Sequence, residues 1–327
     1  MRAIFIAKAG GPEVLELRDA EQPAPAEGEI LVRVHAAGVN RADVLQRMGK
    51  YPAPPGVPAD IPGLEYAGEV TALGAGVTRW KAGDRVMGLV AGGAYAEYVV
   101  THEDTALAIP RGWSNDDAGA VPEVFLTAYD ALIRQVHLAA GDVVLIHAVG
   151  SGVGTAALQI AKAFGATVIG TSRSAAKLKS ALPLGLDVAV DTSRERFGDA
   201  VARATAGRGV DVVLDLIGGA LWSETLGTLA PRGRLILVGL TAGRSAEVDL
   251  GVILGKRLTI VGTTLRARPL AEKAALTGDF ARDVLPLLAG ERLRPIVDHV
   301  FPMAEAAEAH RRMEADAHFG KLVLNWA

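Results

Sequence analysis

Three glycines within five residues join an apolar run to an amphipathic stretch in residues 147–162, HAVGSGVGTAALQIAK. Glycine-rich turns of this kind bind dinucleotides, because the backbone can approach a pyrophosphate at a helix N-terminus. The spacing departs from G-x-G-x-x-G, and the frame that ends on Gly154 fits the helix best. In this frame, Gly154 is the glycine that lets the helix pack closely on the strand, and Ser151 occupies the position nearest the cofactor. We predict a nucleotide site here; the alternative is a tight turn without a ligand.

The next turn along the chain, residues 170–177, indicates which nucleotide would bind. NAD-specific sites hold the ribose 2′-hydroxyl with an acidic residue about twenty positions beyond the glycines, yet no Asp or Glu occurs between Val143 and Leu186. The stretch GTSRSAAK instead offers a hydroxyl and two cations, Ser172, Arg173 and Lys177, which suit a 2′-phosphate. We therefore predict NADPH as the cofactor. The alternative for the two cations is that they are solvated charges at a helix start.

Other chemistries find little support in the sequence. The chain of 327 residues has no cysteine, and its seven histidines show no metal-ligand spacing. Thiolate nucleophiles and zinc sites built on cysteine are therefore excluded, and neither G-x-S-x-G nor H-E-x-x-H occurs. We expect His147 to be structural, because it closes a buried strand. Hydride transfer remains, since it needs no protein nucleophile.

The charge balance favours small, roughly neutral partners. With 34 Lys and Arg against 37 Asp and Glu, the formal net charge is −3, which gives no basic field for nucleic acid or an anionic membrane. No apolar run reaches the length of a membrane span. The first residues alternate like a strand and do not resemble a signal peptide. We expect a cytoplasmic protein.

Six apolar runs, separated by helix-like segments, must position the glycine-rich turn. Their alternation with helices predicts an α/β fold with a doubly wound, parallel six-stranded sheet. The predicted strands cover residues 143–147, 167–171, 187–191, 210–217, 233–239 and 258–263.

The flanking regions have a different pattern. Up to about residue 120, short β-rich runs separated by Gly and Pro are typical of a small, bent barrel or sandwich. Five prolines in the eleven residues 52–62 predict a stiff, irregular loop. After Leu265 we predict one amphipathic helix over residues 271–290 and a β/α tail that returns to the N-terminal domain. The predicted domains are residues 1–122 with 265–327, and residues 123–264.

The sequence resembles the medium-chain dehydrogenase/reductase superfamily over nearly its full length. GPEVLEL, GVNRADVLQRMGKYP, GLEYAGEV and WKAGDRV are similar to its GroES-like catalytic domain, and LIHAVGSGVGTAALQIAKAFGATVIGT is similar to its Rossmann cofactor turn. NRADVLQR, YPAPPG, HAVGSGVGTAA, DLIGG and FGKLVL most resemble the zinc-free NADPH:quinone oxidoreductase branch, in particular the tumour-suppressor-induced group. The resemblance implies a GroES-like β-rich catalytic domain and a Rossmann domain with the six-stranded sheet.

The resemblance also bears on metal binding. In zinc-dependent members, three ligands occupy the positions of Asn40, Leu64 and Glu123. None of the three keeps its ligand identity here, and Glu123 alone could not hold zinc. We predict no metal, and the resemblance implies that the nicotinamide occupies the vacated region.

By the same resemblance, the cofactor contacts would come from both domains. Tyr51 and Ser151 are the hydroxyls that we expect near an acceptor, and we predict them as catalytic. Alternatives remain open: Tyr51 only packs beside the proline-rich loop, Ser151 only binds phosphate, or Asn40 is a turn residue. Thr192 replaces a tyrosine that relatives often place against adenosine, which would weaken NADPH binding. The implied cofactor-binding residues are Asn40, Tyr51, Thr127, Ser151, Gly152, Val153, Ser172, Arg173, Lys177, Leu265, Arg266 and Lys321.

These observations predict a zinc-independent NADPH:quinone oxidoreductase that transfers hydride to a quinone in a cleft between domains. A first alternative is an enoyl-thioester or alkenal reductase, whose phosphopantetheine arm would need a basic groove. A second is an NADPH-binding sensor without catalysis. The resemblance further implies a homodimer formed through the edge strand 258–263. The cations available for a groove are Arg41, Arg47, Lys50, Arg266 and Arg268.

Overall fold

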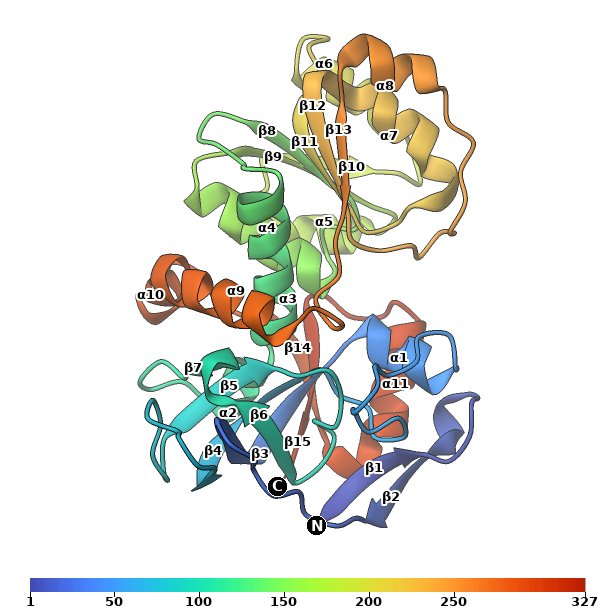
Figure 1. Ribbon diagram of the computed structural model, residues 1–327. Helices are drawn as coiled ribbons and strands as arrows, with labels where there is room; N and C mark the ends of the chain where they lie inside the picture. The colour runs from blue at the N-terminus through green and yellow to red at the C-terminus, as the bar shows by residue number, and fades with distance from the viewer. Residues whose placement is uncertain (327) are drawn as a thin grey trace. The chain divides into compact units, whose positions relative to one another are not determined.

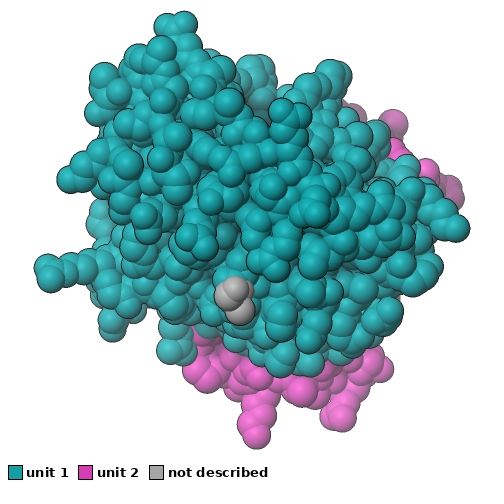
Figure 2. Space-filling view, turned by 90° about the horizontal axis from the view of Figure 1, so that it is seen from below, with its two compact units in different colours: residues 1–126, 265–327 teal, residues 127–264 magenta. Residues whose placement is uncertain are grey.

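The computed structural model describes residues 1–326 and divides into two compact units (Figure 2). Unit 1 comprises Met1–Leu126 and the chain from Leu265 onward; unit 2 comprises Thr127–Thr264. Among the described residues, no helix combines the length and the apolar character needed to cross a bilayer.

Unit 2 contains a parallel sheet of six strands, as the alternation of apolar runs and helices predicted (Figure 1). The strand order is β10-β9-β8-β11-β12-β13. The order reverses between β8 and β11, which is the position where such sheets bind ligands at the carboxyl ends of their strands. The strands are β8 (Val143–Ile146), β9 (Thr167–Ser172), β10 (Val188–Asp191), β11 (Val210–Asp215), β12 (Leu229–Leu237) and β13 (Thr259–Gly262).

Helices cover both faces of this sheet, which is why its central strands are apolar throughout. Val144, Leu145 and Ile146 of β8 are fully buried. Strand β12 begins four residues before its predicted start, and an irregular register beside Val210 accommodates Pro231. The helices are α4 (Gly152–Ala163), α5 (Ala175–Ala181), α6 (Phe197–Ala204), α7 (Trp222–Thr228) and α8 (Leu250–Lys256).

Unit 1 contains a mainly antiparallel sheet with the order β14-β15-β3-β4-β5-β7, and β6 also pairs with β3. Strand β3 carries two register shifts, which let a long strand bend around the core. A separate pair, β1 with β2, completes the unit. The strands are β1 (Arg2–Ile6), β2 (Leu15–Asp19), β3 (Glu29–Val39), β4 (Glu65–Leu73), β5 (Arg85–Leu89), β6 (Tyr98–His102), β7 (Ala106–Ala108), β14 (Val297–Pro302) and β15 (Lys321–Asn325).

The last strand of the chain is hydrogen-bonded to the third. In the β15–β3 ladder, Leu322 lies opposite Val39, so Lys321 lies beside the end of β3. Residues 51–64 form the irregular proline-rich loop that the sequence predicted.

One predicted helix is wrong. Residues 271–290 form two helices, α9 (Leu270–Asp283) and α10 (Leu285–Ala289), instead of one. Pro286 explains the break, because it has no N–H to donate and its ring collides with the carbonyl four residues earlier in a continuous helix. The remaining helices are α1 (Arg41–Arg47), α2 (Asn115–Gly119), α11 (Ala306–Glu314) and α3 (Pro122–Tyr129), whose residues divide between the two units.

Candidate functional site

The glycine turn, residues 147–154, connects β8 to α4 in unit 2. A Cβ on Gly154 would lie 2.5 Å from the carbonyl oxygen of Ala148 and 2.8 Å from the Cα of Val149. Both are backbone atoms that cannot move aside, so only glycine allows this approach, as predicted. The positive φ of the turn falls on Ala148, at 50°, a conformation that non-glycine residues adopt rarely.

The start of α4 has the chemistry of a phosphate site. Ser151 is the N-cap, and its Oγ accepts a hydrogen bond from the N–H of Gly154 at 3.1 Å. The N–H groups of Gly152 and Val153 precede the first backbone bond of the helix and lie at its positive end, where an anion would be stabilised. These residues fit a diphosphate. The Ser151 hydroxyl acts here as a helix cap, and its predicted catalytic role stays a prediction.

The end of β9 holds the second part of the predicted site. Ser172 accepts a hydrogen bond from the N–H of Ser174, and Ser174 caps α5 by accepting from the N–H of Lys177. Arg173 is exposed between them. Hydroxyl and cationic donors therefore gather at this strand end, which fits a 2′-phosphate.

The structure places one acidic residue next to this strand end, although it lies outside the stretch Val143 to Leu186 that contains no Asp or Glu. Asp191 ends β10 and lies opposite Ser172 in the sheet. Hydrogen bonds from the Oγ and N–H of Ser193 lower the pKa of Asp191 and turn its carboxylate toward its own loop. The adjacent Thr192 donates its N–H to the carbonyl of Ser172. The preference for NADPH therefore stays a prediction.

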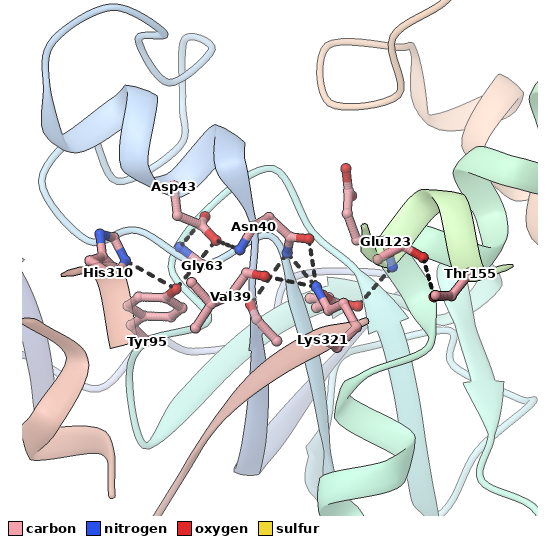
Figure 3. A network of polar contacts seen from close by, with 12 residues as sticks. Val39, Asn40, Asp43, Gly63, Tyr95, Glu123, Thr155, His310 and Lys321 are labelled. Atoms are coloured by element: carbon pink, nitrogen blue, oxygen red, sulfur yellow. Dashed lines mark hydrogen bonds and ion pairs between the residues drawn. The ribbon is translucent and has the colours of Figure 1, made fainter. Parts of the chain in front are cut away.

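Unit 1 contains a buried polar group that we call the lysine cluster: Lys321, Glu65 and Asn40. Figure 3 shows Lys321 beside Asn40. The ammonium of Lys321 donates to Glu65 Oε1 at 2.7 Å, to Asn40 Oδ1 at 2.6 Å and to the carbonyl of Val39 at 2.9 Å. All three of its N–H groups are thereby used. Lys321 is 3% exposed and Glu65 fully buried, so each charge requires the other.

The cluster fixes the side chain of Asn40. Its Nδ2 donates to Glu65 Oε1 at 2.9 Å, while its Oδ1 accepts from Lys321. Asn40 is also the N-cap of α1, and its backbone N–H donates to Asp43 Oδ2 at 2.8 Å. These contacts are what we would expect if Asn40 is a structural turn residue, which is the alternative that the sequence left open. Contacts of Asn40 and Lys321 with a cofactor stay predictions.

Two further carboxyl groups lie next to the cluster, and sequence reasoning gave neither a role in chemistry. Burial raises the pKa of Asp43 to about 6, although N–H groups of Asn40 and Gly63 oppose the shift. Burial and the charge of Glu65 raise the pKa of Glu123 to about 8. The only sequence signal for Glu123 was its position at a former zinc ligand.

Tyr51 and Arg266, both predicted site residues, lie together in unit 1. The Arg266 guanidinium lies 5.0 Å from the ring centre of Tyr51 and donates to the Tyr51 carbonyl. It also donates to the carbonyl of Ala91 and to Gln46 Oε1. Burial raises the pKa of Tyr51 and lowers that of Arg266. Leu265 is buried in the same unit.

The former zinc positions do not fit a metal. Leu64 is buried and has no donor atom, and both ends of the Asn40 amide are hydrogen-bonded within the lysine cluster. Across residues 1–326, no three His, Cys, Asp or Glu side chains are grouped to hold an ion. Thr127, the remaining predicted site residue, is buried in α3. Both ring nitrogens of His147 are hydrogen-bonded, one to the hydroxyl of Thr171 and the other to that of Thr225.

Comparison with known proteins agrees with this architecture. Residues 26–111 match the family model described as "Alcohol dehydrogenase GroES-like domain", and residues 152–281 match that described as "Zinc-binding dehydrogenase". A protein named quinone oxidoreductase from Pseudomonas aeruginosa is 37% identical over 328 residues, covering 99% of each chain.

Solved structures agree as well. The quinone oxidoreductase of Escherichia coli complexed with NADPH superposes with a TM-score of 0.91 at 32% identity, over 99% of this chain and 100% of that one. The CurK enoyl reductase gives a TM-score of 0.88 at 28% identity, over 100% of this chain and 99% of that one. The chain belongs to the medium-chain dehydrogenase/reductase superfamily. It is an oxidoreductase of the type that binds a nicotinamide dinucleotide.

Proposed function

We propose that this protein is an NADPH-dependent, zinc-independent quinone oxidoreductase. The observation that carries the proposal is the lysine cluster, which occupies the former metal region with a buried cation and leaves no set of metal ligands among residues 1–326. The relatives named quinone oxidoreductase support the choice of acceptor. NADPH, when bound, supplies the hydride.

In this proposal, residues of the chain bind the cofactor and orient the acceptor. The N-terminus of α4, with Ser151, Gly152 and Val153, holds the diphosphate. Ser172, Arg173 and Lys177 hold the 2′-phosphate. In unit 1, the hydrogen-bonded Asn40 and the Tyr51 ring beneath Arg266 give the acceptor a rigid polar surface.

Steady-state kinetics with 1,2-naphthoquinone and crotonyl thioester, each with NADPH and NADH, test the proposal. We expect a higher kcat/KM for the quinone, and a higher kcat/KM with NADPH than with NADH. A preference for the thioester would refute the quinone assignment, and equal use of NADH would refute the assignment of the 2′-phosphate site.

An enoyl-thioester reductase is the second candidate, because the CurK enoyl reductase has the same fold. Its thioester arm would need a basic groove. Two of the five predicted groove cations lie inside unit 1: Arg47 pairs with Glu314 and has no exposed side-chain surface, and Arg266 is buried. A third, Arg41, is neutralised at the surface by Asp316. The scarcity of available cations favours a quinone over an enoyl thioester as the acceptor.

We also propose that two copies pair through β13. This strand pairs only with β12 in the described chain, so its other edge keeps unpaired N–H and carbonyl groups. The preceding helix α8 exposes two large apolar side chains, with 72% of Leu250 and 81% of Leu254 accessible. Analytical ultracentrifugation should show a dimer, and Leu254→Glu should shift it toward monomer; a monomeric wild-type protein would refute the pairing.

A further inference from the structure

The Glu123 carboxyl differs from the other acids around the lysine cluster. It lies in the first turn of α3, and its backbone N–H donates to Glu65 Oε2 at 2.8 Å. Its side chain extends away from the cluster (Figure 3) and makes no hydrogen bond to any residue of 1–326. The residue is half-buried, so the protein removes much of the water around its carboxyl group. Glu123 therefore presents a carboxyl group that is not already committed to a protein partner.

Burial and, after it, the charge of Glu65 raise the pKa of this carboxyl group, so that the protonated form is favoured at neutral pH. Glu65 and Asp43 oppose its ionisation, and Lys321 and Arg266 favour it. Lys273 of α9 also interacts favourably with the ionised form. Burial and the Glu65 charge outweigh these cations, which places the pKa of Glu123 at about 8.

The two hydroxyls that sequence reasoning selected are poorer proton donors. Burial raises the pKa of Tyr51 above its ordinary value of about 10, so its proton is held more tightly. The Ser151 hydroxyl caps α4. General acids work best when their pKa lies near the working pH, and only Glu123 among these three meets that condition.

We propose that Glu123 is the general acid that protonates the reduced acceptor. This role rests on the proposed hydride transfer. NADPH, when bound, would supply a hydrogen with two electrons from its C4–H bond, which would oxidise the cofactor and leave the quinone as a hydroquinone monoanion. The O–H of Glu123 then gives its proton to the anionic oxygen, and water reprotonates the Glu123 carboxylate.

The proton on Glu123 can be observed without turnover. Infrared difference titration of the cofactor-free protein should show a carboxylic acid band that disappears with a midpoint near pH 8. Glu123→Gln should remove that band, whereas Glu272→Gln, on the exposed start of α9, should leave it. A wild-type protein with no carboxyl group titrating above pH 7 would overturn the proposal.

The kinetic test uses full-length protein, NADPH and 1,2-naphthoquinone. Glu123→Gln should lower kcat about 100-fold or more, with unchanged NADPH affinity, and should abolish the decline of kcat above pH 8. Glu123→Asp, which keeps an acidic proton, should recover part of the rate and the pH dependence. A normal kcat and pH profile in Glu123→Gln would refute the acid role while leaving quinone reduction intact; absence of turnover by the wild-type protein would refute the proposed function itself.

Discussion

The glycine turn of unit 2 and the lysine cluster of unit 1 use the chain in contrasting ways. The turn is one continuous stretch of eight residues, shaped by backbone contacts around Gly154. The cluster joins the end of β3, the start of β4 and the start of β15, and charge pairing holds it together. The first region depends on steric fit and the second on compensation of buried charge, so they should fail differently when altered.

Removal of the cluster's cation should have the largest effect. Lys321→Met leaves Glu65 buried without its partner, which should reduce the free energy of unfolding by about 3–5 kcal/mol. Chemical denaturation measures the loss. The double variant Lys321→Met with Glu65→Gln should recover part of it, because no unpaired charge remains. Equal stability of the single and double variants would contradict the importance of charge compensation.

Acid should weaken both units through one buried histidine in each. Burial lowers the pKa of His147 in unit 2 to about 4 and that of His310 in unit 1 to about 3. The unfolded chain binds protons below pH 6.5 and the folded chain does not, so stability is fully present above pH 6.5 and falls as the pH drops toward 4. The loss should be on the order of 2–3 kcal/mol for each histidine. Denaturation curves between pH 8 and 4.5 check this, and His147→Gln should reduce the slope.

Steric change in the glycine turn should have a smaller effect on stability. Gly154→Ala should reduce the free energy of unfolding by about 1–3 kcal/mol, because the new methyl group meets backbone atoms of Ala148 and Val149. It should also weaken NADPH binding, measured by fluorescence titration. Gly278→Ala in α9 is the matched control, since open space surrounds the added group, and it should stabilise the helix by about 0.5–1 kcal/mol. Similar losses for both variants would show that steric fit at Gly154 is unimportant.

The smallest effect concerns cofactor preference alone. Arg173→Ala should reduce the ratio of NADPH to NADH affinity roughly tenfold without changing the melting temperature, because one charge-assisted contact to the 2′-phosphate is lost. Isothermal titration with both cofactors measures the ratio. Lys179→Ala, on the exposed side of α5, is the control and should leave the ratio unchanged. An unaltered ratio in Arg173→Ala would remove that residue from the site.

Much of the fold could be predicted from the sequence. The six strands of unit 2 are apolar because helices cover both faces, and that burial is visible as separate hydrophobic runs. The close approach at Gly154 could be predicted as well, since the glycine and the atoms it meets are within six residues of one another. The break at Pro286 was missed because the apolar periodicity continues across it, although the backbone cannot.

The sheet and the position of its glycine turn could be read from the sequence, because both depend on residue type and local spacing, whereas the loss of the zinc ligands followed from the family resemblance. The folded chain was needed to see that Lys321 pairs with Glu65, that both hold the Asn40 amide, and that burial raises the pKa of Glu123. These properties arise from the pairing of β15 with β3, which joins residues almost 300 positions apart. Burial then makes the electrostatic interactions between them strong enough to shift a pKa.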